Sequence, residues 1–464
     1  MNKSSFGLIG LGVMGRNLLL NVADHGFQVS GLDLDPKQVS AMKAERLEGH
    51  QLEAFTSTDE FLASLTSPRT IMLLVPAGAI VDQVIESLVP KLDKGDLIID
   101  GGNSHFLDTE RREQFLNSKG LLFLGTGVSG GAQGARKGPS IMPGGDFEAY
   151  QRVAPIFEAI TAKYESEPCV SYIGRSGAGN YVKMVHNGIE YAIMQSIAEV
   201  YALFRSYGFS NAEVKTAFDS YQKGRLSSFL IEITAAILGT KDPKGKGELV
   251  DNILDKAKQK GTGKWTSQNA MDLGIAIPSI DMAVSQRALS ALKELRVQLS
   301  GNKPHPEKID FNTLVEQAEK ALYASFAIAY AQGLQQISEA SKAYDYQIDL
   351  VSVIKLWRGG CIIQSRMLGD LATSFENESI LHLFESSHFK SALSEAVEGL
   401  RELVLSGVKN ALPIGTLSSS LSYYDTLHCS DLPVNMVQAQ RDFFGSHTYE
   451  RKDQPGIFHH DWSL

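Results

Sequence analysis

Cysteine is scarce in this chain: the 464 residues include three, Cys169, Cys361 and Cys429, which lie far apart. An odd number of widely spaced cysteines argues against a disulfide scaffold and indicates a reducing compartment, which we expect to be the cytoplasm. Cys-X-X-Cys pairs, which commonly bind zinc, are missing from the sequence as well. We therefore expect neither a disulfide framework nor a metal site.

Long uninterrupted apolar runs and an excess of positive charge are also missing. Arg16 and regularly spaced glycines break the apolar run at residues 6–20, so we expect folded structure there and no targeting or transmembrane segment. The formal net charge of −9 disfavours a nucleic-acid or anionic-membrane binder. An anionic ligand would have to be bound by local basic residues.

The chain is too long for one hydrophobic core, and its pattern changes along its length. Short apolar runs at residues 6–9, 28–32, 70–75, 97–99 and 121–124 predict buried strands, separated by amphipathic helical stretches. This alternation predicts a parallel, doubly wound α/β sheet with right-handed crossovers, which we assign to residues 1–178.

Helical periodicity dominates after a glycine-rich junction at residues 174–179, and we assign an all-α domain to residues 179–432. One helix is expected from about residue 180 to 206. Two echoes suggest a duplicated helical unit: residues 189–192 resemble residues 328–331, and residues 221–224 resemble residues 357–360. Residues 433–464 are polar and aromatic, and we expect a C-terminal tail that packs on another surface.

A glycine motif follows the first expected strand and opens a helix: Gly10-Leu11-Gly12-Val13-Met14-Gly15. In such a motif the glycines allow a tight turn, close approach of backbone amides to a pyrophosphate and close helix–sheet contact, while the helix N-terminus stabilises the anion. The motif and the acidic Asp33 at the end of the next strand together predict dinucleotide binding.

Asp33-Leu34-Asp35 bears on the kind of dinucleotide. A carboxylate at Asp33 can accept hydrogen bonds from both ribose hydroxyls and would repel a 2′-phosphate. The alternative, that the carboxylate only caps the following helix, fits Asp35 well.

Small and polar residues follow two later strands, in Asp100-Gly101-Gly102-Asn103-Ser104 and in Gly127-Val128-Ser129-Gly130-Gly131. Ligands of open α/β sheets bind outside the carboxyl ends of the strands, and these groups suit a polyhydroxylated or carboxylate ligand. Ordinary glycine-rich turns would explain either segment alone.

Basic residues stand beside flexible ones around Lys260 and Lys264, at Arg287, and in the tail at Arg441 and His447. They could converge on a phosphate. Taken singly, each is more often a solvated surface group, and the sequence does not show that they converge.

One face of the expected helix at residues 180–206 carries Lys183, His186, Asn187 and Glu190, at i, i+3, i+4 and i+7. This face supplies a potential base and a potential acid, as a site that removes and delivers a proton requires. The alternative is a polar face exposed to solvent. Gly188 favours a site, because glycine costs a helix about 1 kcal/mol relative to alanine unless something approaches the backbone.

Together these motifs resemble the 6-phosphogluconate dehydrogenase family, decarboxylating enzymes of the pentose phosphate pathway. The resemblance runs over nearly the whole chain. It is carried by Ile99-Asp100-Gly101-Gly102-Asn103-Ser104, residues 127–131, residues 182–191, Lys260-Gly261-Thr262-Gly263-Lys264-Trp265 and Gln438-Ala439-Gln440-Arg441-Asp442. It implies a Rossmann-like N-terminal domain, a duplicated all-α domain and, at residues 433–464, a tail that reaches the partner subunit of a homodimer.

The resemblance also implies an activity: oxidative decarboxylation of 6-phosphogluconate to ribulose 5-phosphate and CO₂, with reduction of NAD or NADP. It implies Lys183 as general base and Glu190 as general acid. The implied cofactor contacts are Gly10, Gly12, Val13, Met14, Gly15, Asp33, Leu34, Asp35, Val75, Pro76, Ala77 and Asn103. The implied substrate contacts are Asn103, Ser129, Gly130, Gly131, His186, Asn187, Tyr191, Lys260 and Arg287, with Arg441 and His447 from the other subunit.

Two segments depart from the family pattern. Many members use NADP and carry Asn-Arg-Thr where this chain has Asp33-Leu34-Asp35, and Val-Lys-Ala-Gly where it has Val75-Pro76-Ala77-Gly78. Both positive groups are lost and acids are gained, so we expect a preference for NAD.

Two other functions stay open on the sequence. The chain could be another β-hydroxyacid dehydrogenase that acts on an unphosphorylated acid, which retention of Lys260, Arg287 and Arg441 disfavours. It could also be a catalytically silent dinucleotide sensor, although a sensor needs neither Lys183 nor Glu190.

Overall fold

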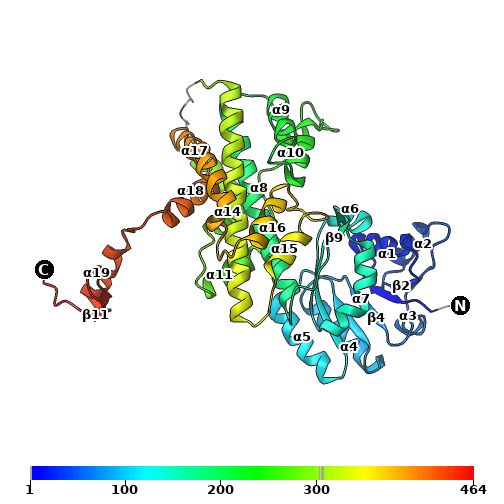
Figure 1. Ribbon diagram of the computed structural model, residues 1–464. Helices are drawn as coiled ribbons and strands as arrows, with labels where there is room; N and C mark the ends of the chain where they lie inside the picture. Colours follow the sequence, from blue (N-terminus) through cyan, green and yellow to red (C-terminus); the bar gives the residue numbers. More distant parts are fainter. Residues whose placement is uncertain (1–2, 302–303, 305–307, 464) are drawn as a thin grey trace.

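The computed structural model describes residues 3–301, 304 and 308–463, and shows a sheet domain, a helical domain and a protruding tail (Figure 1). The sheet has the strand order β3-β2-β1-β4-β5-β6-β7, in which β1 to β6 are parallel and β7 runs antiparallel to β6. Its strands are β1 (Phe6–Ile9), β2 (Val29–Leu32), β3 (Leu52–Phe55), β4 (Thr70–Leu73), β5 (Leu97–Asp100), β6 (Leu122–Val128) and β7 (Ile141–Gly145).

Helices cover both faces of this sheet, and each face has its own apolar cluster. They are α1 (Val13–Asp24), α2 (Pro36–Ala44), α3 (Thr58–Ala63), α4 (Ala79–Leu88), the short η1 (Val89–Lys91), α5 (Phe106–Ser118), α6 (Gly131–Lys137) and α7 (Phe147–Ile160). A small hairpin, β8 (Lys163–Tyr164) and β9 (Glu167–Pro168), follows. The predicted doubly wound sheet is thus confirmed, although β3 and β7 were not predicted.

The helical domain is built around two long helices, α8 (Ala178–Ser206) and α14 (Phe311–Ala343), which share one large apolar core. The helix predicted at residues 180–206 is confirmed as α8. The other elements are α9 (Asn211–Tyr221), α10 (Phe229–Gly239), η2 (Leu249–Asn252), α11 (Thr262–Asp272), α12 (Pro278–Ala291), α13 (Lys293–Leu299), α15 (Leu350–Leu356), α16 (Met367–Asn377), η3 (Leu383–Glu385), α17 (Ser387–Lys409) and α18 (Gly415–Leu427). None of the helices in the described ranges is long and apolar enough to cross a bilayer.

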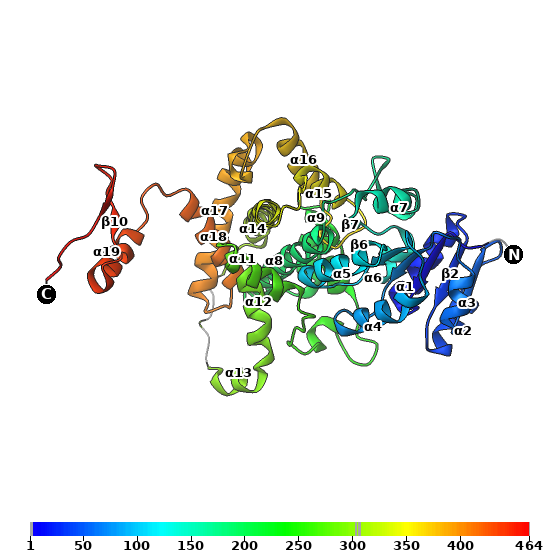
Figure 2. The same ribbon diagram turned by 90° about the horizontal axis from the view of Figure 1, so that it is seen from below.

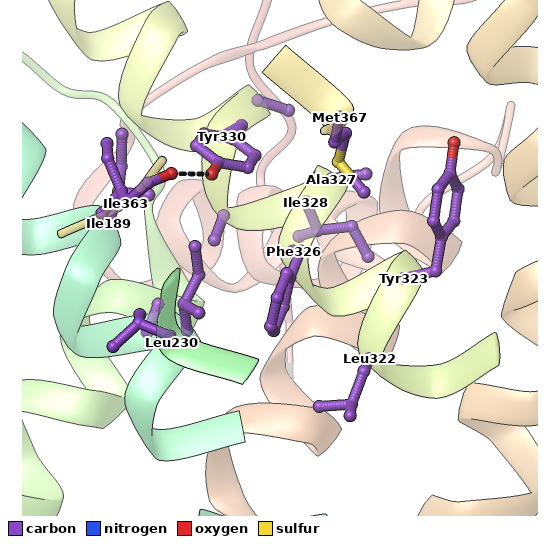
Figure 3. Packing of buried hydrophobic residues seen from close by; sticks show 14 of the residues in the cluster. Ile189, Leu230, Leu322, Tyr323, Phe326, Ala327, Ile328, Tyr330, Ile363 and Met367 are labelled. Atoms are coloured by element: carbon purple, nitrogen blue, oxygen red, sulfur yellow. Dashed lines mark hydrogen bonds between the residues drawn. The ribbon is translucent and has the colours of Figure 1, made fainter. Parts of the chain in front are cut away.

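The order long helix, short helix, short helix occurs twice, as α8-α9-α10 and as α14-α15-α16. The sequence echoes fall at matching places in the two units. The segments before α10 and α16 pair as antiparallel backbone, with Phe229 N donating to Gln364 O at 3.1 Å and Arg366 N to Ser227 O at 2.8 Å. Figure 3 shows part of the apolar core of the helical domain. In this core the Tyr330 hydroxyl of α14 donates to Ile363 O at 2.6 Å. These features support the predicted duplication.

The tail contains α19 (Val434–Gly445) and a hairpin of β10 (Tyr449–Glu450) and β11 (Ile457–Phe458), and it extends away from the body (Figure 2). Its internal structure centres on the buried Asp442 carboxylate. This carboxylate accepts hydrogen bonds from Thr448 N, His459 Nδ1, His460 N and Trp462 Nε1, at 2.8–3.1 Å. Burial opposes ionisation, but the hydrogen bonds prevail and hold the pKa of Asp442 well below its usual range.

The two domains meet where α8 lies directly on the backbone of β6 and β7. A Cβ atom on Gly179 would lie 2.3 Å from Gly125 O and 2.4 Å from Met142 O, and one on Gly144 would lie 2.4 Å from Gly179 N. Because these neighbours are backbone atoms, a change of side-chain rotamer could not relieve the clash. We call this contact, at Gly125, Gly127, Gly144 and Gly179, the glycine seam.

The seam explains why the prediction for β6 was too short. The apolar run predicted a strand that ends at residue 124. Glycine usually weakens strands, yet β6 continues through Gly125 and Gly127 to Val128. Here the missing side chains let α8 approach the sheet.

Replacing Gly179 by alanine should destabilise the protein by about 1–3 kcal/mol, the range for overpacking a tight interior site. Gly301→Ala is the control, because a Cβ atom there would meet nothing within 4 Å. Urea unfolding of both variants measures the difference. Equal midpoints for the two variants would contradict the account of the seam.

Candidate active site

The seam places Lys183 at the junction of the two domains. A Cβ atom on Gly127 of β6 would lie 2.4 Å from Lys183 Cβ, so the lysine side chain starts directly against the strand. Lys183 is 6 % exposed. His186, on the next turn of α8, is fully buried.

A hydrogen-bonded cluster surrounds the Lys183 amine. Lys183 Nζ donates to Asn187 Oδ1 at 2.9 Å and lies 3.4 Å from His186 Nδ1. His186 Nδ1 lies 3.0 Å from Asn187 Oδ1, and His186 Nε2 lies 3.2 Å from Ser129 Oγ. With the proton on Nδ1, His186 donates to Asn187 and accepts from Ser129. Asn187 Nδ2 donates to Thr262 Oγ1 at 3.0 Å, which fixes the amide.

Burial shifts both proton-transfer candidates toward their neutral forms. Desolvation lowers the pKa of Lys183, against the opposing effect of Glu190, so the amine loses its proton more easily. Desolvation raises the pKa of Glu190, against the opposing charges of Lys183 and Arg287, so this carboxyl retains its proton to higher pH. Desolvation and the Lys183 charge hold the pKa of His186 well below its usual value, which keeps the imidazole neutral.

Glu190 and Tyr191 continue the site along α8. Glu190 Oε2 lies 3.9 Å from His186 Nδ1, and its side chain is 19 % exposed. The Arg287 guanidinium lies 3.2 Å from the centre of the Tyr191 ring, a cation–π contact, and its Nη1 donates to Lys258 O at 3.1 Å. The predicted helix face is therefore confirmed as a set of neighbouring groups, and Arg287 joins it from α12.

Gly188 has a packing role that the sequence did not indicate. A Cβ atom on Gly188 would lie 2.7 Å from Thr266 Cγ2 of α11, whose hydroxyl donates to Met184 O at 2.9 Å. The backbone is indeed closely approached, but by a neighbouring helix. Helix packing therefore explains Gly188, and this glycine does not by itself indicate a site.

The glycine motif has the geometry of a dinucleotide loop. Gly10, at φ +100°, and Gly15 are required by the chain itself: added Cβ atoms would lie 2.5 Å from Leu74 O and 1.8 Å from Gly10 O. At Gly12 an added Cβ atom would meet nothing within 4 Å. Gly12 is also the N-cap of α1 and provides no side-chain cap. The open space before an uncapped helix N-terminus fits a bound pyrophosphate. Val13 lies there exposed and Met14 half-buried.

Asp33 supports the glycine loop through hydrogen bonds to backbone amides. Its carboxylate accepts from Leu11 N at 2.8 Å and from Asp35 N at 2.9 Å. Asp35 caps α2 by accepting from Lys37 N at 2.9 Å, as the alternative interpretation of that residue predicted. Leu34 is 81 % exposed.

The loops after β4 and β5 are tied together by the buried Arg112. Arg112 donates to Gly78 O at 3.0 Å, and to Asp100 Oδ2 and Ser104 Oγ at 3.2 and 3.1 Å. Between these anchors, Pro76, Ala77 and Asn103 are exposed and Val75 is half-buried. Arg112 was not singled out from the sequence, because its partners lie in loops that only the fold brings together.

The loop after β6 is held by the second helical unit. Gly130 could not carry a Cβ atom, which would lie 2.6 Å from Gly360 O, while at Gly131 nothing lies within 4 Å. Trp357 packs edge-on against the His186 ring, with 5.9 Å between centroids. Trp357 and Thr262 lie in segments noted in the sequence, but we did not assign them to the site, since nothing in the sequence indicated contact with α8.

The remaining predicted site residues lie outside this cluster. Lys260 is exposed on the segment before α11. Arg441 lies in α19 and His447 just after it, so within one chain the tail carries both away from α8 (Figure 2). In the described ranges, no group of His, Cys, Asp and Glu side chains is arranged to hold a metal ion.

Comparison with known proteins agrees with this arrangement. Residues 5–174 match the NAD binding domain of 6-phosphogluconate dehydrogenase, and residues 179–462 match the 6-phosphogluconate dehydrogenase C-terminal domain. The decarboxylating 6-phosphogluconate dehydrogenase of Lactococcus lactis is 46% identical over 100% of this chain and 99% of its own length. The NADP(+)-dependent, decarboxylating enzyme of Bacillus subtilis is 46% identical over 100% of both chains.

A solved structure of the same family is also similar to this chain over its whole length. Plasmodium falciparum 6-phosphogluconate dehydrogenase, studied in its apo form and with NADP+ or 6-phosphogluconate, superposes with a TM-score of 0.94 at 39% identity, covering 99% of this chain and 100% of that one. Domain matches over both halves and full-length identity point to one conclusion: this chain belongs to the 6-phosphogluconate dehydrogenase family.

Proposed function

We propose that this chain oxidises and decarboxylates 6-phosphogluconate to ribulose 5-phosphate and CO₂, with Lys183 as general base and Glu190 as general acid. The observation that carries the proposal is the Lys183 amine, buried against β6 and hydrogen-bonded to Asn187 at 2.9 Å. A surface lysine would be protonated near neutral pH and could not accept a proton. Burial lowers the pKa of Lys183 and so favours the neutral amine that a base requires.

In the first step, neutral Lys183 takes the proton of the substrate 3-hydroxyl while the C3 hydrogen leaves with its electron pair. The nicotinamide cofactor, when bound at the glycine loop, supplies the acceptor for that hydride. The product of this step is a 3-keto acid. Lys183 now carries a proton beside the new carbonyl oxygen.

In the second step, the C1–C2 bond breaks and CO₂ leaves. The electron pair moves toward C3, and protonated Lys183 gives its proton to the C3 oxygen, which forms an enediol. In the third step, Glu190 protonates C2 and Lys183 takes back the hydroxyl proton, which gives ribulose 5-phosphate. The raised pKa of Glu190 suits it to this last donation.

The other side chains would bind and orient the substrate. We assign the sugar-acid portion to Asn103, Ser129, Gly130, Gly131, His186 and Asn187, of which the last two are fixed beside Lys183. We assign the phosphate to Tyr191, Lys260 and Arg287, where Arg287 is held by its stacking on Tyr191.

The alternative that the sequence left open is a catalytically silent dinucleotide sensor. Turnover of 6-phosphogluconate by the wild-type protein separates the two functions, and Lys183→Ala tests the base: its turnover should fall by at least about 10³-fold, because the base is lost, while cofactor binding is retained. Spectrophotometry at 340 nm with NAD and NADP, and binding calorimetry, measure the two effects. Lys342→Ala, an exposed lysine of α14, is the control.

Two results would count against this function. Wild-type protein that binds cofactor without substrate-dependent reduction would favour the sensor. A fully active Lys183→Ala variant would refute the base assignment.

We also propose that the enzyme prefers NAD to NADP. The Bacillus subtilis relative is NADP(+)-dependent by name, so the proposal rests on the residues of this chain alone. Asp33 places a carboxylate at the end of β2 and Leu34 is exposed beside it, which leaves a 2′-phosphate facing negative charge.

Leu34→Arg should raise kcat/KM for NADP at least about tenfold and change kcat/KM for NAD little, because a guanidinium pairs with a 2′-phosphate. The exposed side chain of Leu34 makes this change possible without disturbing the bonds from Asp33 to Leu11 N and Asp35 N. Steady-state kinetics with both cofactors measure it. A wild-type kcat/KM that is higher for NADP would overturn the proposed preference.

The tail supports a homodimer with exchanged tails as a further part of the proposal. Its exposed apolar side chains need a surface to cover them: Val434, Met436, Val437, Phe444 and Ile457. Placed on a second copy of the chain, the tail would bring Arg441 and His447 to the substrate phosphate. The three cysteines are free thiols, which suits the cytoplasm as the proposed location.

A further inference from the structure

The segment at residues 253–260, which ends at Lys260, contains no helix or strand. It connects η2 to α11, and each of its residues is exposed. Such a segment has little burial to order it, so its position depends on specific contacts.

Those contacts come from one face of α12 and α13, two consecutive helices that project from the helical domain (Figure 2). Arg287 and Ser290 of α12 and Lys293 and Arg296 of α13 each contact the segment, and these four side chains define this face. Arg287 Nη1 donates to Lys258 O at 3.1 Å, and Ser290 Oγ accepts from Ala257 N at 3.0 Å.

Asp255 makes the charged contacts of the segment. Its Oδ1 lies 2.7 Å from Lys293 Nζ, and its Oδ2 accepts from Arg296 Nη1 at 2.8 Å. Arg296 also donates from Nη2 to Asp255 O at 3.1 Å and to Ser290 O at 3.0 Å. The Arg296 guanidinium therefore binds both the side chain and the backbone carbonyl of Asp255, and it links them to the backbone near the end of α12.

The same face carries a group that we assign to the substrate phosphate. Arg287 lies against the Tyr191 ring and at the same time holds Lys258 O, two residues before Lys260. Asp255 anchors the start of the segment and Arg287 its middle, so the position of Lys260 relative to Arg287 depends on both anchors.

We propose that Asp255, through Lys293 and Arg296, is a positioning residue that holds Lys260 where it meets the substrate phosphate together with Arg287. The inference rests on the proposed function, because the phosphate contacts belong to it. Exposed ion pairs add little to global stability, so loss of Asp255 leaves the fold intact and loosens the segment.

The variant Asp255→Asn keeps the shape of the side chain and removes its charge. KM for 6-phosphogluconate should rise about five- to tenfold, while kcat and KM for the dinucleotide change less than about twofold, because the segment serves substrate binding. Asp255→Glu should restore most of the loss. Glu316→Gln, which breaks the exposed pair with Lys320 on α14 at 2.8 Å, is the matched control.

Lys260→Ala and the double variant Asp255→Asn/Lys260→Ala separate this inference from the function on which it rests. Lys260→Ala alone should raise KM, and Asp255→Asn should then add less than about twofold, because Asp255 acts through Lys260. Independent, multiplying effects would overturn the positioning role, as would an unchanged KM in Asp255→Asn. A normal KM in Lys260→Ala would overturn the phosphate assignment and this inference with it.

Discussion

The rest of the molecule depends on backbone-to-backbone contact between α8 and the sheet. Gly179 lies against Gly125 O and Met142 O, and Gly144 lies against Gly179 N, at distances that admit no side chain. This contact fixes both the depth and the rotation of a 29-residue helix relative to β6. Since α8 carries the candidate base and acid, the seam also decides where the chemistry can take place.

Burial then shifts the pKa values of the two proton-transfer candidates. Lys183 emerges beside Gly127, loses its hydration, and has its pKa lowered, while Glu190, farther along α8, has its pKa raised. Uncompensated burial of a lysine is costly, and here Asn187 accepts a hydrogen bond that limits the cost. The helical domain completes the site through Thr262, Arg287 and Trp357.

The sequence predicted what local periodicity encodes and missed what distant contacts decide. β1, β2, β4, β5 and α8, and the shared face of Lys183 and Glu190, were predicted, because burial patterns and helix spacing are local properties. β6 was predicted too short and the packing role of Gly188 was not predicted, because these glycines contact residues far along the chain, in α8 and at Thr266. Nothing in the sequence indicated the proposed role of Asp255, since its ion-pair partners lie 38 and 41 residues away along the chain.

The central claim is that burial at the seam makes Lys183 a base, and the ionisation of its amine tests this most directly. NMR titration of the protein labelled with ¹³C at the lysine ε-carbons, assigned by comparison with Lys183→Arg, gives that pKa. The account predicts a value clearly below the ordinary lysine value of about 10.4. A Lys183 signal that titrates at or above that value would contradict it.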